Sequence, residues 1–349
     1  MKEFNYNKYL DYKWNNNILN LISTLHEYKE KQIILLKQKP ATLERLETFA
    51  KIQSTEASNA IEGIRTTSSR FKKLYNEKIR PHNRAEEEIM GYKEVLDIIN
   101  ENYNYIPINK NIILQFHRDL FKYSSKGIGG NFKINQNYIS AADENNNLFT
   151  IFEPLTPFGT PGAVEAICNN YNSQINTNEV DPLILIPVFI HDFLCIHPFN
   201  DGNGRMSRLL TNLLLLKNDY IVGKYISLEE LIAKNKNQYY DILQECQTGW
   251  YEGAENIEPF IEYLLSILLA AYREMENKVN INNENSDSLG IVKNALNQIY
   301  GKITKTDLAN LCPTISIKTV EAAIKKLVDD KILIKQGRGK GTYYIKNNE

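Results

Sequence analysis

One apolar segment followed by a polar turn constrains the fold of this chain more than any other feature. Residues 183–196, LILIPVFIHDFLCI, carry apolar side chains over most of a helical surface, so we expect a buried helix here. His197 should lie where that helix ends, because Pro198 biases the preceding residue away from the helical region. The glycines of DGNG then allow a sharp turn before a second apolar helix, at about 204–217.

The turn and its flanks, residues 197–208, contain side chains that can bind phosphates and transfer a proton. A histidine at a buried helix end is well placed for proton transfer near neutral pH. Gly202 and Gly204 allow backbone N–H groups to point inward at the start of the next helix, which favours an anion. Arg205 and Arg208 are three residues apart, and we expect them to point together as a polyphosphate clamp. Asp201 offers hard oxygen ligands for a Mg²⁺ that bridges phosphates, so the pattern predicts nucleophilic attack on a nucleotide phosphate.

Helical periodicity extends over most of the first 276 residues. Helices are expected within 1–105, at 108–123 and at about 163–177, 182–196, 204–217, 227–247 and 256–276. The runs NYIS and LFTIF, separated by AADENNN, predict a hairpin or flap on this helical body. The predicted fold class is therefore mainly α, with a helical core and a β-hairpin flap.

The end of the sequence has a different pattern. Residues 277–288 are polar, Asn-rich and without periodicity, which predicts a linker, although the preceding helix could run on into it. Residues 289–349 predict three helices and then two strands around the turn GRGKG, an order that resembles a winged helix-turn-helix. This tail is basic whereas the rest is acidic, so DNA binding and a protein-contact or dimerisation role both stay open. The expected domains are 1–105, 106–276, the linker 277–288, and 289–349.

Composition restricts the compartment and the partners. A net charge of -1 and a pI near 6.6 argue against a chain that binds polyanions over its whole surface. The four widely spaced cysteines match neither a zinc site nor a disulfide framework, which indicates free buried thiols in a reducing compartment. The N-terminal segment lacks a signal-peptide core, and the longest apolar runs are too short to span a bilayer. We therefore expect a cytoplasmic protein without a membrane partner.

The segment HPFNDGNGRMSR, residues 197–208, resembles the signature of the Fic family. That signature reads His-Pro-Phe-x-Asp/Glu-Gly-Asn-Gly-Arg-x-x-Arg, and every fixed position is matched. The resemblance implies transfer of AMP from ATP to a Tyr, Ser or Thr hydroxyl of a target protein and of the enzyme itself. Pyrophosphate would be released, and Mg²⁺ would be the cofactor.

The same resemblance implies roles for individual residues. His197 would be the general base that deprotonates the target hydroxyl, Asp201 would hold Mg²⁺, and Phe199 would anchor the loop in the core. Tyr239 and Tyr240 fall in a helix that family members use near the nucleoside, and the sequence does not decide between them. Five further residues would bind the phosphates of ATP. The α- and β-phosphates would be held by Gly202, Asn203 and Gly204, and the outer phosphates by Arg205 and Arg208.

The segment GIGGNFKINQNYI resembles the Gly-x-Phe/Tyr-Arg stretch that leads into the flap of the family. Lys133 stands where arginine is usual. The flap, at about residues 138–160, would pin the backbone of the target by strand addition. Its docking residues would be Phe149, Thr150 and Ile151.

Upstream, the segment SNAIEG at 58–63 resembles the inhibitory motif of the family, Ser/Thr-x-x-x-Glu-Gly/Asn. The resemblance implies that this helix lies across the nucleotide site, with Glu62 paired to Arg208 in the place of the γ-phosphate. Ser58 lies one turn before Glu62 on the same helix face, and Gly63 fits a helix C-terminus. A carboxylate can occupy the clamp that an arginine offers to a phosphate, so ATP would bind in an unreactive pose.

Two functions from different classes fit these patterns. The first is an autoinhibited protein adenylyltransferase, and the second is a DNA-binding regulator whose Fic core senses a nucleotide. A phosphocholine or UMP transferase is a third variant within the family. ATP and a target protein are the expected partners, with a homodimer and DNA at the tail as further candidates.

Overall fold

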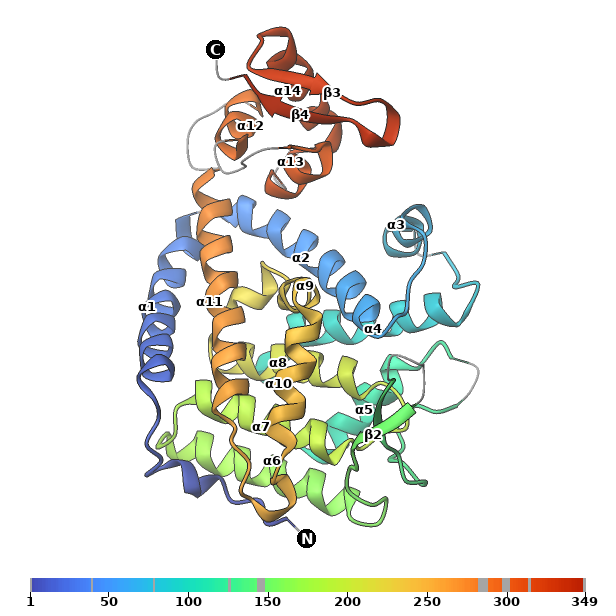
Figure 1. The fold of residues 1–349 in the computed structure, drawn as a ribbon, viewed down its shortest axis with the longest axis vertical. Coiled ribbons are helices and arrows are strands. Elements are labelled where there is room, and N and C mark those ends of the chain that lie inside the picture. The colour runs from blue at the N-terminus through green and yellow to red at the C-terminus, as the bar shows by residue number, and fades with distance from the viewer. Residues whose placement is uncertain are drawn as a thin grey trace. The chain divides into compact units, whose positions relative to one another are not determined.

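The computed structural model describes residues 2–38, 40–77, 79–124, 127–142, 148–281, 288–296, 302–312 and 315–347. The chain divides into a larger unit of residues 1–29 and 50–271, and a smaller unit of residues 30–49 and 272–349. Helices make up most of both units (Figure 1). The strands described form two separate antiparallel pairs, so the mainly α fold class is confirmed.

Helix α7 (Pro182–Ile196) lies at the centre of the larger unit, where every residue from Leu183 to Ile196 is buried. Its start is fixed by Asp181, whose side chain accepts a hydrogen bond from the Leu183 N–H, and by a proline at the first helical position. Burial of each large apolar side chain contributes about 1.5–3 kcal/mol, which explains why so apolar a helix occupies the core.

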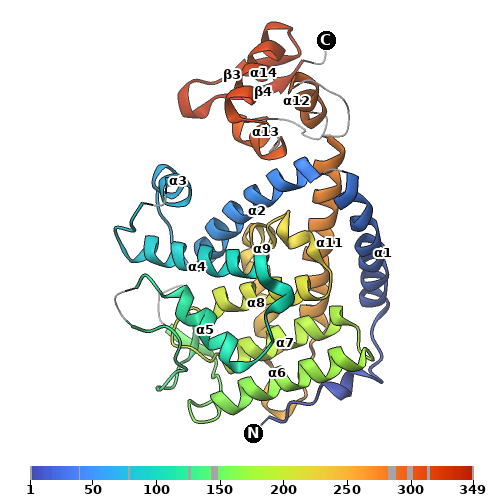
Figure 2. The ribbon, with the colours of Figure 1, turned by 180° about the vertical axis from the view of Figure 1, so that it is seen from behind.

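Three helices, α4, α5 and α6, pack with α7 and its neighbour α8. Helices α6 (Thr160–Thr177) and α8 (Asn203–Lys217) pack against α7, and α4 (Arg84–Asn102) packs against both α8 and α5 (Lys110–Leu120). Figure 2 shows these helices from behind. This packing fixes the turn between α7 and α8, which carries the motif at residues 197–208.

The other helices of the core are shorter or extend into both units. The segment 227–247, expected as one helix, is two, because Asn235 leaves the helical region with φ -127° and ψ 42°. Helices α1, α2 and α11 contribute residues to both units. The bounds are α1 (Asn16–Gln38), α2 (Pro40–Ile61), α3 (Ser68–Glu77), α9 (Leu228–Lys234), α10 (Lys236–Gln247) and α11 (Glu258–Ile281).

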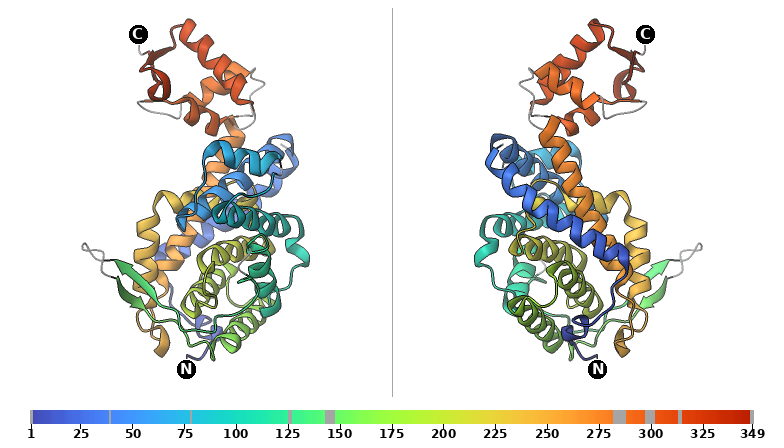
Figure 3. Two further views of the ribbon diagram at one scale, coloured as in Figure 1. Left: turned by 90° about the vertical axis from the view of Figure 1, so that its right-hand side faces the viewer. Right: turned by 90° about the vertical axis from the view of Figure 1, so that its left-hand side faces the viewer.

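The predicted hairpin is present and projects from the helical body of the larger unit (Figure 3). Strands β1 (Ile139–Ala142) and β2 (Leu148–Phe152) pair antiparallel, with Ser140 opposite Thr150 and a register shift between Ile139 and Ser140. The predicted turn residues 143–147 lie outside the described residues.

The C-terminal elements have a core of their own. Their order is α12 (Ser288–Leu296), α13 (Lys305–Leu311), α14 (Ile317–Asp329), β3 (Leu333–Gln336) and β4 (Tyr343–Lys346). Buried residues from all three helices and from β3 pack together: Val292, Ala295, Leu296, Ile303, Leu308, Cys312, Val320, Ala323, Ile324, Leu327 and Leu333. A capping box between Thr304 and Asp307 starts α13.

Helix α11 runs on to Ile281, into the segment expected to be a linker, and α12 begins at Ser288. Residues 282–287 lie outside the described part of the chain. The domain borders expected from the sequence therefore stay predictions.

The four cysteines are unpaired and buried, as their spacing indicated. Within the described ranges, we find no helix with the length and apolar character needed to cross a membrane.

Candidate active site

His197 ends α7 in a left-handed backbone conformation, with φ 48° and ψ 62°. A residue other than glycine held there costs of order 1–3 kcal/mol, so the surrounding contacts must hold it in place. Its backbone N–H donates to the Phe193 carbonyl at 3.0 Å, and its Nδ1 lies 3.2 Å from the Leu194 carbonyl oxygen. The neutral ring therefore donates its Nδ1–H to Leu194, which leaves the Nε2 lone pair available as a base.

Burial lowers the pKa of His197 to about 4, and the positive charge of Lys133 acts in the same direction. The imidazole is therefore neutral at pH 7, which is the form that a general base needs. Lys133 is itself buried and donates to the Ile196 carbonyl at 3.0 Å and to Asn137 Oδ1 at 2.8 Å. Burial lowers its pKa to about 8.

Two asparagines hold the turn after His197. Asn137 Nδ2 donates to the carbonyls of His197 and Phe199, at 3.0 and 2.9 Å. Asn203 accepts from the Phe199 N–H at 2.9 Å and donates to the Phe199 carbonyl at 2.7 Å. The Asn203 side chain is thus fully engaged by Phe199 inside the turn. The group that Asn203 could offer to an anion is therefore its backbone N–H.

His117 supports the turn from α5. Its ring stacks on Phe199, with centroids 3.7 Å apart and an interplanar angle of 5°. Its Nδ1 accepts from the Gly130 N–H and its Nε2–H donates to the Asp201 carbonyl, both at 3.0 Å. Because burial lowers the pKa of His117 to about 4, the ring stays neutral and this tautomer is maintained. His117 therefore ties the turn to the glycine-rich segment that leads into the hairpin.

The N-terminus of α8 is open for an anion. Gly202 precedes the helix with φ 85°, and a Cβ at this position would press on the Phe121 ring. No side chain caps this end, and the first N–H to bond within the helix is that of Met206. The N–H groups before it lack helical acceptors, which is the arrangement that binds phosphates in other proteins.

The end of α2 brings Ser58 and Glu62 to Arg208, as the sequence led us to expect. Arg208 Nε donates to Ser58 Oγ at 2.8 Å, and Arg208 Nη2 donates to the Ser58 carbonyl at 3.0 Å and to Glu62 Oε1 at 2.8 Å. Gly63, with φ 77°, follows the helix end, and the N–H of Ile64 donates back to the Asn59 carbonyl. Arg208 is 4% exposed, whereas the Glu62 side chain is 30% exposed, so the Ser58 contacts are buried and the Glu62 contact is partly open to water.

Glu62 also lies over the start of α8. Its Oε1 is the atom nearest to the position that a Cβ on Gly204 would take, and that Cβ would clash with it. Lys236, at the start of α10, donates to the Ile61 carbonyl at 2.5 Å and so holds the end of α2 from a second side. The carboxylate of Glu62 is thus held in place over the turn that would receive phosphates.

Arg205 and Arg208 do not point together, contrary to the sequence-based expectation. Arg205 is fully buried, with Nη1 2.6 Å from Glu88 Oε2 and Nη2 3.3 Å from Asp201 Oδ1. Arg84 completes the cluster, with Nε 2.5 Å from Glu88 Oε1 and Nη2 2.7 Å from Asp201 Oδ2. The reason is the buried Glu88 on α4, which needs a cationic partner and draws Arg205 away from the side that faces Arg208.

Asp201 is the residue that could hold a metal. Its side chain is 38% exposed, and both of its oxygens already contact guanidinium groups. Among the described residues, no group of three or more acids, histidines or cysteines could hold a metal ion on its own. Because Mg²⁺ in proteins is commonly bound by one or two carboxylates together with substrate phosphates, this donor set fits a Mg²⁺ that arrives with a nucleotide.

A pocket of about 430 Å³ adjoins these residues, a size that suits a small ligand. Glu62, His197, Gly204 and Arg208 line it, and both candidate tyrosines do so too: Tyr239 is buried and Tyr240 is 41% exposed. Burial raises the pKa of both tyrosines, so they stay protonated.

The hairpin closes one side of this pocket. Of its three expected docking residues, Ile151 lines the pocket, whereas Phe149 and Thr150 are exposed on β2. Ile139 and Ser140 of β1 line it as well.

Sequence reasoning missed five residues that shape the site: Arg84, Glu88, His117, Asn137 and Lys236. They lie on separate segments far from the motif, so no spacing rule connects them to it. Only the chemical character of these residues could have indicated a role. Charged and polar residues are seldom buried without a partner, so such residues in otherwise apolar segments are candidates for buried contacts.

The fold and the site together define a class of protein: a helical domain in which the turn between α7 and α8 can accept an anion. Residues 107–215 match the model of the Fic/DOC family. Residues 107–215 therefore form a Fic domain.

Relatives and solved structures agree with this assignment. The Protein adenylyltransferase Fic of Aedes aegypti is 27% identical over 237 residues, which cover 64% of this chain and 41% of that protein. The protein of the same name from Culex quinquefasciatus is 26% identical over 239 residues, with the same coverage. The chain thus spans about two fifths of the length of these relatives.

Two crystal structures share the fold. A Fic family protein from Desulfovibrio desulfuricans G20 aligns with a TM-score of 0.63 and 20% identity, over 97% of this chain and 98% of its own. A Fic domain containing signaling protein from Bacteroides thetaiotaomicron VPI-5482 aligns with a TM-score of 0.60 and 23% identity, over 78% of this chain and 99% of its own.

Proposed function

We propose that this chain is a protein adenylyltransferase that transfers AMP from ATP to a Tyr, Ser or Thr hydroxyl of a target protein and of itself. One observation carries the proposal: His197, whose Nδ1 contacts the Leu194 carbonyl and leaves Nε2 as the base, lines the same pocket as Arg208 and as Gly204 at the open N-terminus of α8. A base and an anion cradle beside one cavity are the parts that attack on a nucleotide phosphate requires. The name carried by the relatives agrees with this reaction.

The reaction balances with the groups at hand. The target hydroxyl oxygen forms a bond to the α-phosphorus of ATP, and the bond from that phosphorus to the β-phosphate oxygen breaks. His197 Nε2 takes the hydroxyl proton, and pyrophosphate leaves. The N–H groups at the start of α8 face the phosphate oxygens on which negative charge develops, and the exposed strand β2 offers a backbone edge to the target.

Mg²⁺ would be held by Asp201 together with the phosphates of ATP, and it would supply charge neutralisation on the leaving pyrophosphate. Arg84 and Arg205 orient the Asp201 carboxylate from both sides. Arg208 would bind the γ-phosphate once Glu62 has left it.

We further propose that the enzyme is autoinhibited by Glu62. The support is steric as well as electrostatic, because the carboxylate fills the space above Gly204 and pairs with Arg208 at the same time. ATP that enters while Glu62 is in place cannot set its phosphates along α8, so the in-line geometry for attack is not reached.

Position-specific labels test the reaction. Incubation with ATP labelled at the α-phosphate should label protein, and incubation with ATP labelled at the γ-phosphate should not, because only AMP is retained. His197→Ala should lower this labelling by about 10²–10⁴-fold. ATP should still bind to the variant, because His197 acts on the attacking hydroxyl and not on the phosphates. Label from the γ-phosphate would instead indicate a kinase-type reaction and would contradict the proposal.

The second candidate is a regulator whose Fic domain only senses a nucleotide. The observation in its favour is that Glu62 occupies the catalytic turn in the structure described. This candidate predicts ATP binding with no labelled protein from any variant, which the same experiment measures.

A further inference from the structure

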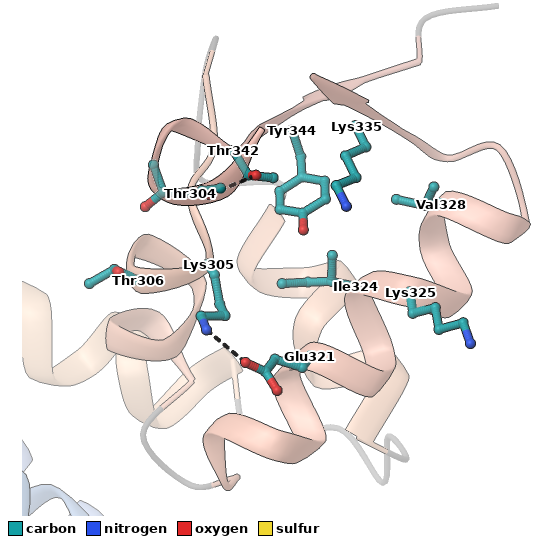
Figure 4. Close-up of a pocket in the computed structure, with 11 residues that line it drawn as sticks. Thr304, Lys305, Thr306, Glu321, Ile324, Lys325, Val328, Lys335, Thr342 and Tyr344 are labelled. Carbon is teal, nitrogen blue, oxygen red and sulfur yellow. Dashed lines mark hydrogen bonds and ion pairs between the residues drawn. The ribbon is translucent and has the colours of Figure 1, made fainter. Parts of the chain in front are cut away.

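A groove of about 980 Å³ crosses the C-terminal elements (Figure 4). It is bounded by the start of α13, one face of α14 and the β3–β4 hairpin. Its walls combine lysines with small hydroxyl side chains and a few apolar ones: Thr304, Lys305, Thr306, Glu321, Ile324, Lys325, Val328, Lys335, Thr342 and Tyr344. Two successive helices and the hairpin that follows them therefore contribute to one open surface.

The charges in this groove are unbalanced. Lys305 Nζ lies 2.7 Å from Glu321 Oε1, so this acid is already neutralised by a neighbour. Lys325 on α14 and Lys335 on β3 have no carboxylate partner among the residues that the structure describes. Figure 4 shows the Lys335 side chain extending beside the Tyr344 ring. The groove thus offers two unneutralised cations, one on its helix wall and one on its hairpin wall.

Charged side chains of both signs lie beyond the groove. Lys318 and Lys326 are exposed on α14 and Arg338 is exposed in the turn of the hairpin, whereas Asp329 and Asp330 are exposed at the end of α14. In the sequence, residues 289–349 contain 11 lysines and arginines against 5 acids, whereas the rest of the chain has 30 against 37. The net excess of lysine and arginine therefore lies at this end of an otherwise acidic sequence.

We propose that this groove binds the phosphate backbone of duplex DNA, with α14 directed into the adjacent major groove. In a duplex one strand of phosphates separates the major from the minor groove. A helix in the major groove and a hairpin over the minor groove leave that strand between them, where Lys325 and Lys335 lie. Helix α14 has 13 residues, about 20 Å in length, and the major groove is wide enough to admit it.

DNA fits these observations better than a protein partner does. Protein interfaces place large apolar side chains at their centre and are depleted in lysine. Here the cations come from both walls of the groove, and its apolar residues Ile324 and Val328 lie at its base and edge, one buried and one half-buried. Lysines spaced along a channel match a continuous line of phosphates.

The experiment uses the 349-residue chain and a fluorescent 25-base-pair duplex of mixed sequence. Fluorescence anisotropy gives the affinity at several salt concentrations between about 50 and 200 mM, the range over which phosphate binding is weakened. The groove variant Lys325→Gln/Lys335→Gln should reduce the slope of log affinity against log salt by about 2, one for each lysine–phosphate pair that the substitutions remove.

A matched control is Lys293→Gln/Lys302→Gln. It removes the same charge from two exposed lysines, one on α12 and one just before α13, that do not line the groove. Circular dichroism should show equal melting for both double variants. No duplex binding by the wild type at 50 mM salt would overturn the proposal. Equal slopes in the groove and control variants would overturn it as well, since binding would then depend on overall charge.

Discussion

Glu62 Oε1 lies 2.8 Å from Arg208 Nη2 and fills the space that a side chain on Gly204 would need. One carboxylate therefore occupies both the guanidinium that would hold an outer phosphate and the helix start that would hold the inner ones. The sequence separation of 146 residues shows that packing of α2 against α8 creates this contact.

The first prediction concerns Arg208. Once Glu62→Gly removes the carboxylate, Arg208 is free to bind the γ-phosphate, so Arg208→Ala in that background should lower AMP transfer by about 10²-fold or more. The comparison is between the Glu62→Gly variant and the Glu62→Gly/Arg208→Ala variant, at equal ATP and Mg²⁺. Arg65→Ala, an exposed arginine just after α2, serves as the control and should change little.

The second prediction concerns Lys236, which donates to the Ile61 carbonyl at the end of α2. Lys236→Gln should weaken the hold on Glu62 and raise AMP transfer by about tenfold or more, because a hydrogen bond from a charged group contributes about 1.5–3 kcal/mol and about 1.4 kcal/mol corresponds to a factor of ten. Lys234→Gln removes a charge from a neighbouring, more exposed lysine and should leave the rate unchanged. A Lys236→Gln rate equal to that of Lys234→Gln would show that this hydrogen bond does not hold Glu62 over the turn.

The third prediction concerns His117. His117→Gln removes the stack on Phe199 and cannot satisfy both Gly130 and Asp201 in the same geometry. We expect the free energy of unfolding to fall by about 1–3 kcal/mol, the usual cost of a buried polar group left without its partner. Urea denaturation measures this change, and His82→Gln, at an exposed histidine, is the control.

The fourth prediction is a decrease in stability in mild acid. Burial lowers the pKa of His117 and of His191 to about 4, whereas a histidine in the unfolded chain titrates near 6.5. Between these values the unfolded state binds more protons, so the free energy of unfolding falls as the pH drops from 6.5 towards 4. The slope is about 1.4 kcal/mol per pH unit for each histidine. His191→Gln should reduce the slope measured by urea denaturation at pH 7.5, 6 and 5, whereas His82→Gln should not.

The contiguous parts of the site could be predicted from the sequence. Helix α7 was expected at 182–196 and is found at Pro182–Ile196, because an apolar segment bounded by a cap and a proline has few alternatives. Strand β2 follows the run LFTIF for a similar reason. The turn between α7 and α8 could be identified because all of its chemistry lies within twelve residues.

Contacts between separate helices could not be predicted in this way. Helical spacing predicted that Arg205 and Arg208 point together, and it did not reveal that Glu88 of α4 pairs with Arg205. His117 looked like an ordinary residue of an amphipathic helix, and its role depends on how α5 packs beside the turn. Such pairings follow from tertiary packing, which local patterns do not encode.

The central claim is that this Fic domain transfers AMP and that Glu62 restrains it. The most direct measurement is the rate of AMP incorporation by wild type, Glu62→Gly and Glu62→Gly/His197→Ala, with ATP labelled at the α-phosphate. Removal of one charge-assisted hydrogen bond predicts a rise of about 10- to 100-fold in Glu62→Gly. The His197→Ala double variant should then return to background. Equal rates in wild type and Glu62→Gly would contradict the inhibitory role, and full activity of the double variant would contradict the assignment of His197 as the base.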